Sequence, residues 1–88
     1  MFKLIIAIIR DHDSTGVLDA LVTGNFRATR IASSGGFMRE GNTTLIVGVE
    51  TERVDAAIAT IKSACSPASA AGHRATVFVL TTARYEQI

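Results

Sequence analysis

Four segments of the chain are dominated by apolar or alternating residues and read as strands. The run Phe2–Ile9 is almost unbroken and rich in isoleucine, which predicts a central strand buried on both faces. The segment Phe26–Ala32 alternates, with Phe26 and Ala28 on one side and Arg27, Thr29 and Ile31 on the other. Thr43–Val49 is nearly all apolar, and Ala75–Leu80 predicts the last strand.

Two further segments repeat apolar residues at helical spacing. The polar segment Asp11–Ser14 is suited to capping the first helix, and Gly24 is suited to ending it. Apolar positions between them are Val17, Leu18, Leu21 and Val22. The second helix is expected to start near Thr51. Its inner face is marked by Val54, Ala57, Ile58, Ile61 and Cys65.

The resulting order is strand, helix, strand, strand, helix, strand. It predicts an α+β, ferredoxin-like βαββαβ sandwich over residues 1–88, one four-stranded sheet with two helices on one face. A short internal repeat is consistent with two βαβ halves, because Arg27-Ala28-Thr29 recurs as Arg74-Ala75-Thr76. Two helices leave one apolar sheet face bare, so we expect self-association through that face with closed symmetry.

Composition agrees with self-association and excludes several classes of function. The 88 residues are 48% hydrophobic with a mean hydropathy of +0.32, high for a single small domain. A net charge of +1 and only five aromatic residues argue against nucleic-acid binding. The first apolar run is too short to span a membrane, so a cytoplasmic protein without membrane insertion is expected.

The segment SSGGFMREGN, residues 33–42, separates the second and third predicted strands. Glycines leave its backbone N–H groups accessible, and Phe37 offers a ring on which a base can stack. The amide of Asn42 suits a base edge, and Arg27 and Thr29, at the base of the loop, suit phosphate oxygens. These residues describe a nucleotide pocket. The alternative is a flexible glycine hairpin with an exposed phenylalanine.

Other candidate residues carry weaker indications of chemistry. Asp11-His12-Asp13 offers three potential metal ligands, but consecutive residues rarely converge on one ion, and a helix cap is favoured over a metal site. Cys65, the one cysteine, is expected in the core. His73 and Arg74 could contact a ligand or a neighbouring subunit, or open the last strand in solvent. No catalytic set and no cofactor motif is evident, so a non-enzymatic protein is expected.

Several long stretches resemble the PII-like cyclic di-AMP receptor proteins. They are KLIIAI near the start, NFRATRIASSGGFMREGNTTLIVGVE from Asn25 to Glu50, ERVDAAIATIKSAC in the second helix, and ATVFVL with the Gln87-Ile88 end. The resemblance covers most of the chain. It implies a homotrimeric signal-transduction receptor with a PII-like fold that binds cyclic di-AMP at its subunit interfaces without transforming it.

The resemblance also implies a set of ligand contacts. The strand-side contacts would be Asn25, Arg27, Ala28 and Thr29. The loop contacts would be Gly36, Phe37 and Met38, the returning strand would add Asn42 and Gly48, and the last strand and tail would add Phe78 and Gln87. Arg27, Thr29, Phe37 and Asn42 also follow from the residue chemistry above, whereas Gly48, Phe78 and Gln87 rest on the resemblance.

Two features depart from the family pattern. The second loop, usually long, is reduced to SPASAAGH at residues 66–73, and this loop is the element expected to face a downstream partner. His73 and Arg74 stand where paired glycines are usual. These departures leave open a PII-like trimer that binds ATP, ADP or a partner protein in place of cyclic di-AMP. They also leave the downstream partner unassigned.

Overall fold

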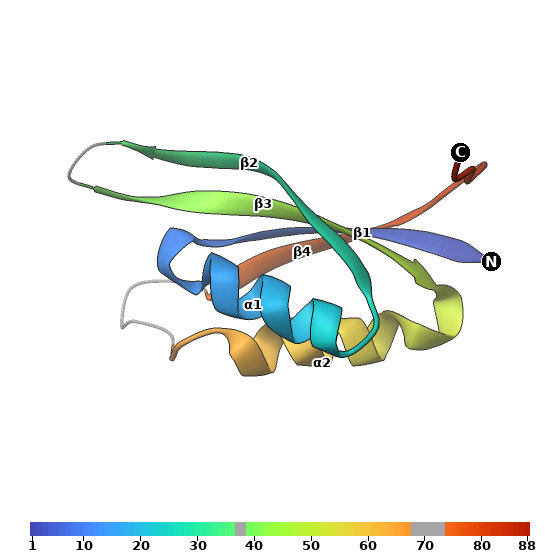
Figure 1. Cartoon of the computed structure of the whole chain (residues 1–88), viewed down its shortest axis with the longest axis horizontal. Coiled ribbons are helices and arrows are strands. Elements are labelled where there is room, and N and C mark those ends of the chain that lie inside the picture. The colour runs from blue at the N-terminus through green and yellow to red at the C-terminus, as the bar shows by residue number, and fades with distance from the viewer. Residues whose placement is uncertain (37–38, 68–73) are drawn as a thin grey trace.

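The chain folds into a four-stranded antiparallel sheet with two helices on one face (Figure 1). The computed structural model describes residues 1–36, 39–67 and 74–88, and side chains are described outside 32–40. The elements are β1 (Phe2–Arg10), α1 (Asp11–Thr23), β2 (Arg27–Gly36), β3 (Arg39–Glu50), a 3₁₀ turn (Thr51–Arg53), α2 (Val54–Ala64) and β4 (Ala75–Thr81).

The strands lie side by side in the order β2-β3-β1-β4. Each βαβ half therefore skips one strand, which the other half supplies, as the ferredoxin-like prediction requires. The predicted fold class and element order are confirmed. No helix in the described part of the chain is long and apolar enough to cross a membrane.

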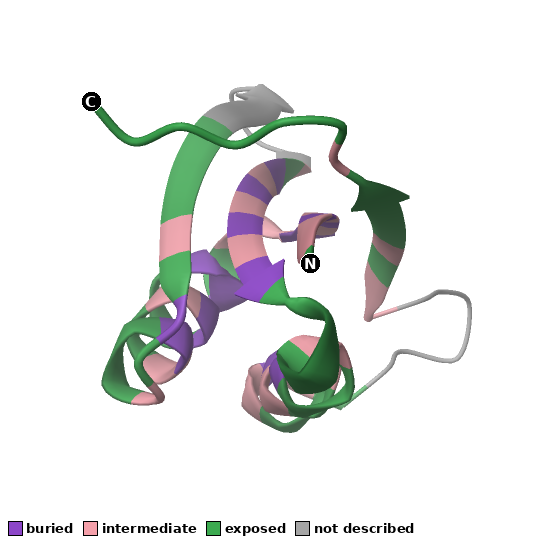
Figure 2. Cartoon of the chain, turned by 90° about the vertical axis from the view of Figure 1, so that its right-hand side faces the viewer, coloured by how far each residue is buried: buried purple, intermediate pink, exposed green. Residues whose placement is uncertain are grey.

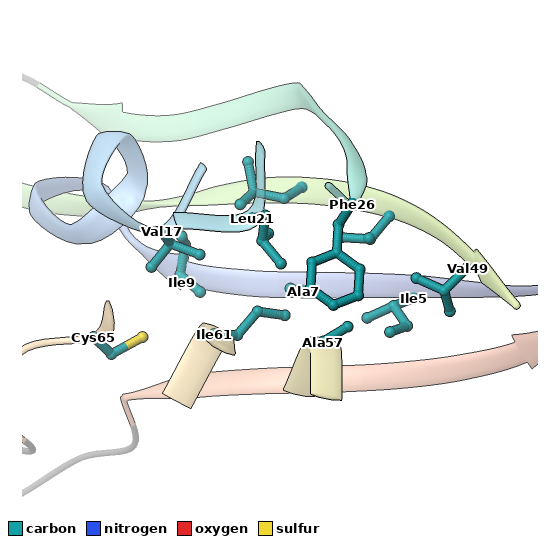
Figure 3. Packing of buried hydrophobic residues seen from close by; sticks show 12 residues of the cluster. Ile5, Ala7, Ile9, Val17, Leu21, Phe26, Val49, Ala57, Ile61 and Cys65 are labelled. Carbon is teal, nitrogen blue, oxygen red and sulfur yellow. The ribbon is translucent and has the colours of Figure 1, made fainter. Parts of the chain in front are cut away.

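The core lies between the sheet and the helices (Figure 3). Alternate residues of the central strands point into it, among them Ile5, Ala7 and Ile9 of β1. The other buried apolar residues are Val17, Leu21, Phe26, Leu45, Val47, Val49, Ala57, Ile61 and Cys65. The predicted core position of Cys65 is thus confirmed. The prediction that β1 is buried on both faces holds for one face, because Leu4, Ile6 and Ile8 on the other are only half-buried in a single chain.

The ends of α1 differ in detail from the sequence-based expectation. Asp11–Ser14 lie inside the first turn rather than before it, and the N-cap position, Arg10, makes no side-chain capping hydrogen bond. Gly24 does follow the helix, but with a φ of −81°, and the left-handed residue is Asn25, with a φ of 65°. The Asn25 N–H bonds to Val22 O at 3.0 Å and the Phe26 N–H to Leu21 O at 2.9 Å. This is the Schellman pattern, with asparagine in the place that glycine usually takes.

The predicted ten-residue loop at 33–42 is wrong. β2 continues to Gly36 and β3 begins at Arg39, with the pairs Ser33↔Thr43, Ser34↔Asn42 and Gly36↔Arg39. The ladder is interrupted by irregularities between Arg30 and Ala32 and again between Ser34 and Gly36. A hairpin pairs backbone groups whatever the side chains are, so a polar, glycine-rich composition does not prevent strand formation.

Candidate functional site

The sheet face opposite the helices gathers several of the predicted ligand contacts. Strand register places Arg27, Gly48, Leu4 and Leu80 in one row across the four strands, and Thr29, Ile46, Ile6 and Phe78 in the next. Neighbours in a row share a face, because side chains alternate along each strand. Arg27 and Thr29 therefore lie on the face that the helices leave bare, which confirms that they point away from the side of Phe26, as the alternation predicted.

Two adjoining clefts lie where this face meets the C-terminal tail. One, of about 350 Å³, is lined by Asn25, Phe26, Arg27, Gly48, Val49, Glu50, Arg53, Phe2, Tyr85 and Gln87. The second, of about 410 Å³, shares Phe2, Arg27, Gly48, Tyr85 and Gln87 with it and adds Lys3, Leu4, Ala28, Thr29, Ile46 and Thr82. The structure thus brings together six of the predicted contacts: Asn25, Arg27, Ala28, Thr29, Gly48 and Gln87.

The C-terminal tail crosses the open sheet face from β4 toward β2 (Figure 2). The Thr82 hydroxyl donates to Phe2 O at 3.1 Å, and the ring of Tyr85 lies 4.3 Å from the ring of Phe2, centroid to centroid. Arg27 Nη1 then donates to Gln87 Oε1. The tail therefore brings an amide oxygen to the one arginine side chain that β2 presents to the clefts.

Gly48 lies at the floor of both clefts beneath the ring of Phe2. A Cβ added at Gly48 would stand 3.3 Å from Phe2 Cε2, closer than most side-chain contacts. The absence of a side chain at Gly48 therefore lets the Phe2 ring approach β3 closely.

Asn25 reaches the clefts because of the left-handed turn at the end of α1. Arg53, in the 3₁₀ segment before α2, stabilises the Gly24–Asn25 turn by hydrogen bonds to its carbonyl oxygens. Its Nη2 donates to Gly24 O at 3.0 Å and its Nη1 to Asn25 O at 3.3 Å. Its guanidinium also lies over the ring of Phe26. Asn25 thus has a structural reason for its identity, since asparagine tolerates positive φ better than other non-glycine residues.

Sequence reasoning missed Phe2, Arg53 and Tyr85 as cleft residues. Phe2 shares the even-numbered face of the first strand with Leu4 and Ile6, and that parity was the available signal. Arg53 and Tyr85 carried no periodic signal, because each acts on a segment far away in the sequence.

The remaining predicted contacts do not join these clefts within one chain. Asn42 lies six positions before Gly48 on β3, which at strand spacing is about 20 Å away. It lines a separate cavity of about 200 Å³ with Ile8, Arg10, Arg74, Ala75 and Thr76. Phe78 lies on the open face, half-exposed, and Gly36 ends β2. Phe37, Met38 and His73 lie outside the described residues.

The Asp11-His12-Asp13 segment joins the two helices. Asp13, almost fully buried, accepts hydrogen bonds from Ser66 N at 3.1 Å and Ser66 Oγ at 2.9 Å, and pairs with Arg10 at 3.1 Å. No cluster of three metal-ligating side chains occurs among residues 1–36, 39–67 and 74–88. The segment predicted as a cap therefore anchors α1 to the end of α2.

Burial and charge shift the pKa values of two groups in this region. Burial acts to raise the pKa of Asp13, but the bonds from Ser66 and the charges of His12 and Arg10 outweigh it, and the pKa falls below its ordinary 3.8. Burial raises the pKa of the Cys65 thiol, and the Asp13 charge adds to that effect. Asp13 is thus held ionised, and Cys65 is held as a neutral core thiol.

Comparison with known proteins identifies relatives of this arrangement. A sequence model of the family described as "Cyclic-di-AMP receptor" matches residues 2–83. A functionally unknown protein from Pediococcus pentosaceus is 34% identical, with a TM-score of 0.79 over 99% of this chain and 97% of that one. Arabidopsis thaliana PII bound to citrate has a TM-score of 0.75 at 22% identity, covering 92% of this chain and 77% of that one. The PII likeness confirms the expected fold.

Proposed function

The chain belongs to the cyclic-di-AMP receptor family, and we propose that it is a non-enzymatic PII-like receptor that binds cyclic di-AMP between the subunits of a homotrimer. The observation that carries the proposal is the meeting of Arg27, Thr29, Gly48 and Gln87 in adjoining clefts on the open sheet face. A guanidinium, a hydroxyl and an amide suit phosphate and ribose oxygens.

The position of Asn42 supports a site built from two subunits. Within one chain it lies about 20 Å from Gly48, on the same strand and on the same sheet face. A neighbouring subunit that packs against the open face can place its Asn42 end beside this cleft. The contacts proposed at Gly36, Phe37 and Met38 would then reach the ligand from that neighbour.

The apolar character of the open face supports the same assembly. Leu4, Ile6 and Ile46 are half-buried there, and Phe78 and Leu80 are 51% and 46% exposed in the single chain. Large apolar side chains in adjacent rows of a sheet are costly to leave in water, and closed association of identical chains buries them.

Calorimetric titration with cyclic di-AMP tests the proposal, with cyclic di-GMP and ATP as competitors. The expected result is saturable binding at one ligand per subunit, selective for cyclic di-AMP. Replacement Arg27→Gln should weaken it by about tenfold or more, since a charge-assisted bond to phosphate is lost. Lys62→Gln, on the exposed surface of α2, makes the same charge change away from the clefts and should bind as the parent does. The proposal fails if cyclic di-AMP releases no heat, or if R27Q binds as tightly as K62Q.

The proposed signal is a change in the β2–β3 hairpin. Ligand held between Arg27 of one subunit and the hairpin of the next would restrict residues 33–42 and shift their population toward one conformation. Hydrogen exchange in this segment should slow when cyclic di-AMP binds. Exchange that stays unchanged at saturating ligand would leave binding intact and refute this mode of signalling.

A further inference from the structure

The cavity of about 200 Å³ at the other end of the open face has polar side chains that, apart from Asn42, the proposed cyclic di-AMP contacts do not use. It lies where β1 ends and β4 begins, and Arg10, Asn42, Arg74 and Thr76 supply its polar side chains. We propose that this cavity is a binding site for a phosphate-type oxyanion, with Arg74 as its principal charge.

The sequence repeat supports this assignment independently of the cavity. Arg27-Ala28-Thr29 opens β2 and lines one of the clefts. Arg74 directly precedes β4, Ala75 and Thr76 open it, and all three line this cavity. β2 and β4 are the closing strands of the two βαβ halves and form the two edges of the sheet. Thr29 pairs with Ile46 and Thr76 with Ile8, so both threonines lie on the open face. The same tripeptide thus presents a guanidinium and a hydroxyl at equivalent places in both halves.

The charges around the cavity leave Arg74 available. Arg10 is paired with Asp13 through Nη2, which also donates to Ser66 O at 2.7 Å. Asp11 accepts from the Thr43 hydroxyl at 2.5 Å. Arg74 is half-buried and forms no ion pair with any other residue in the described ranges. A cation withdrawn from water without a counter-charge is stabilised by an incoming anion.

Arg10 adds positive charge to the wall of the cavity. Its ion pair with Asp13 neutralises that charge, so Arg74 is the cation that an oxyanion in the cavity would neutralise.

The cavity has room for an oxyanion together with water. Its volume of about 200 Å³ is smaller than either cleft at the other end of the face. The anion can be free, or it can be the phosphate of a nucleotide. The inference stands whether or not cyclic di-AMP is the ligand of the clefts, although Asn42 belongs to both proposals.

Amide chemical shifts of isotope-labelled full-length protein test the site, with inorganic pyrophosphate as the probe and sodium chloride of equal ionic strength as the reference. We expect saturable shifts at Asn42, Ala75 and Thr76. Arg74→Gln should weaken this binding about tenfold or more, and Arg74→Lys should weaken it less, because it keeps the charge and loses the fork geometry. Lys62→Gln is the matched control for charge and should bind pyrophosphate as the parent does.

Two results would overturn the inference: the absence of saturable shifts at these three amides, or equal affinity in R74Q and K62Q with both variants folded. Parallel titrations with ATP distinguish the sources of the anion. Tighter binding of ATP than of pyrophosphate supports a nucleotide phosphate, and equal binding supports a free oxyanion. Failure of the cyclic di-AMP proposal is seen separately. In that case cyclic di-AMP causes no amide shifts at Arg27 and Gly48, while pyrophosphate still binds at Asn42, Ala75 and Thr76.

Discussion

The guanidinium carbon of Arg53 lies 4.1 Å from the centroid of the Phe26 ring. The same side chain donates to the carbonyl oxygens of Gly24 and Asn25, so it both covers a core aromatic residue and satisfies the end of α1. The last carbonyls of a helix carry partial negative charge, which a cation there stabilises. Arg53 thus fixes the turn from which β2 and Arg27 start.

Replacing Arg53 should therefore destabilise the fold without touching the core. Arg53→Ala removes the cation–π contact and two hydrogen bonds to carbonyl oxygens, and we expect a loss of about 1–2 kcal/mol in the free energy of unfolding. Arg53→Lys should recover part of this loss, because it keeps the charge. Urea denaturation measures the difference. Arg84→Ala, which removes an exposed tail arginine paired with Glu86, is the control and should change stability by less than about 0.5 kcal/mol. Equal stability of R53A and R84A would contradict the role of Arg53.

Tyr85 reports the position of the C-terminal tail. It is the one tyrosine of a chain without tryptophan, so intrinsic fluorescence arises from the ring that stacks on Phe2. Phe2→Leu keeps most of the apolar bulk and removes the ring pair, which is worth about 1 kcal/mol. We expect lower tyrosine anisotropy and greater quenching by iodide in F2L. Phe78→Leu, which alters a ring elsewhere on the same face, should leave both signals at the parent values. A tail that stays equally ordered in F2L would show that Thr82 and Gln87 hold it without the ring contact.

The stabilising effect of Asp13 should depend on pH. Its folded pKa lies below the ordinary 3.8, so its ion pair and hydrogen bonds stabilise the fold above that pH and are lost as pH falls through the folded value. At pH 7, Asp13→Ala should cost about 3 kcal/mol, because it leaves Arg10 without its counter-charge and the Ser66 N–H and hydroxyl without their acceptor. The difference between parent and D13A should shrink as the pH drops below 3.8. Urea denaturation over a pH series measures it, with Asp19→Ala on the exposed side of α1 as the control. A difference that is constant with pH would show that Asp13 acts through packing and not through charge.

Strand parity predicted one part of the site correctly. The alternation from Phe26 to Ile31 placed Arg27 and Thr29 on the bare face, because a period of two depends only on backbone geometry. The strand pairing at 33–42 could not be predicted this way, because a polar, glycine-rich segment has no alternation of apolar and polar residues to indicate a strand. The left-handed conformation at Asn25 also escaped, because it depends on bonds back to Val22 and on Arg53. The contacts of Gln87 and Tyr85 depend on the path of the C-terminal tail across the sheet, which local sequence periodicity does not predict.

Charge introduced on the open face should dissociate the proposed trimer. Phe78 is 51% exposed in the single chain and pairs with Ile6 in the row that continues to Ile46 and Thr29. If the face is covered by other subunits, Phe78→Glu buries a carboxylate without a partner, and the assembly should fall apart into monomers. Val22→Glu is the matched control, since Val22 is 56% exposed on α1, in the helical layer. Light scattering coupled to size exclusion should give a trimer mass for the parent and for V22E, and a monomer mass for F78E. A parent that is monomeric at every concentration, or an F78E variant with the parent's mass, would mean that this face is not the subunit interface. Asn42 and Arg27 would then belong to separate sites.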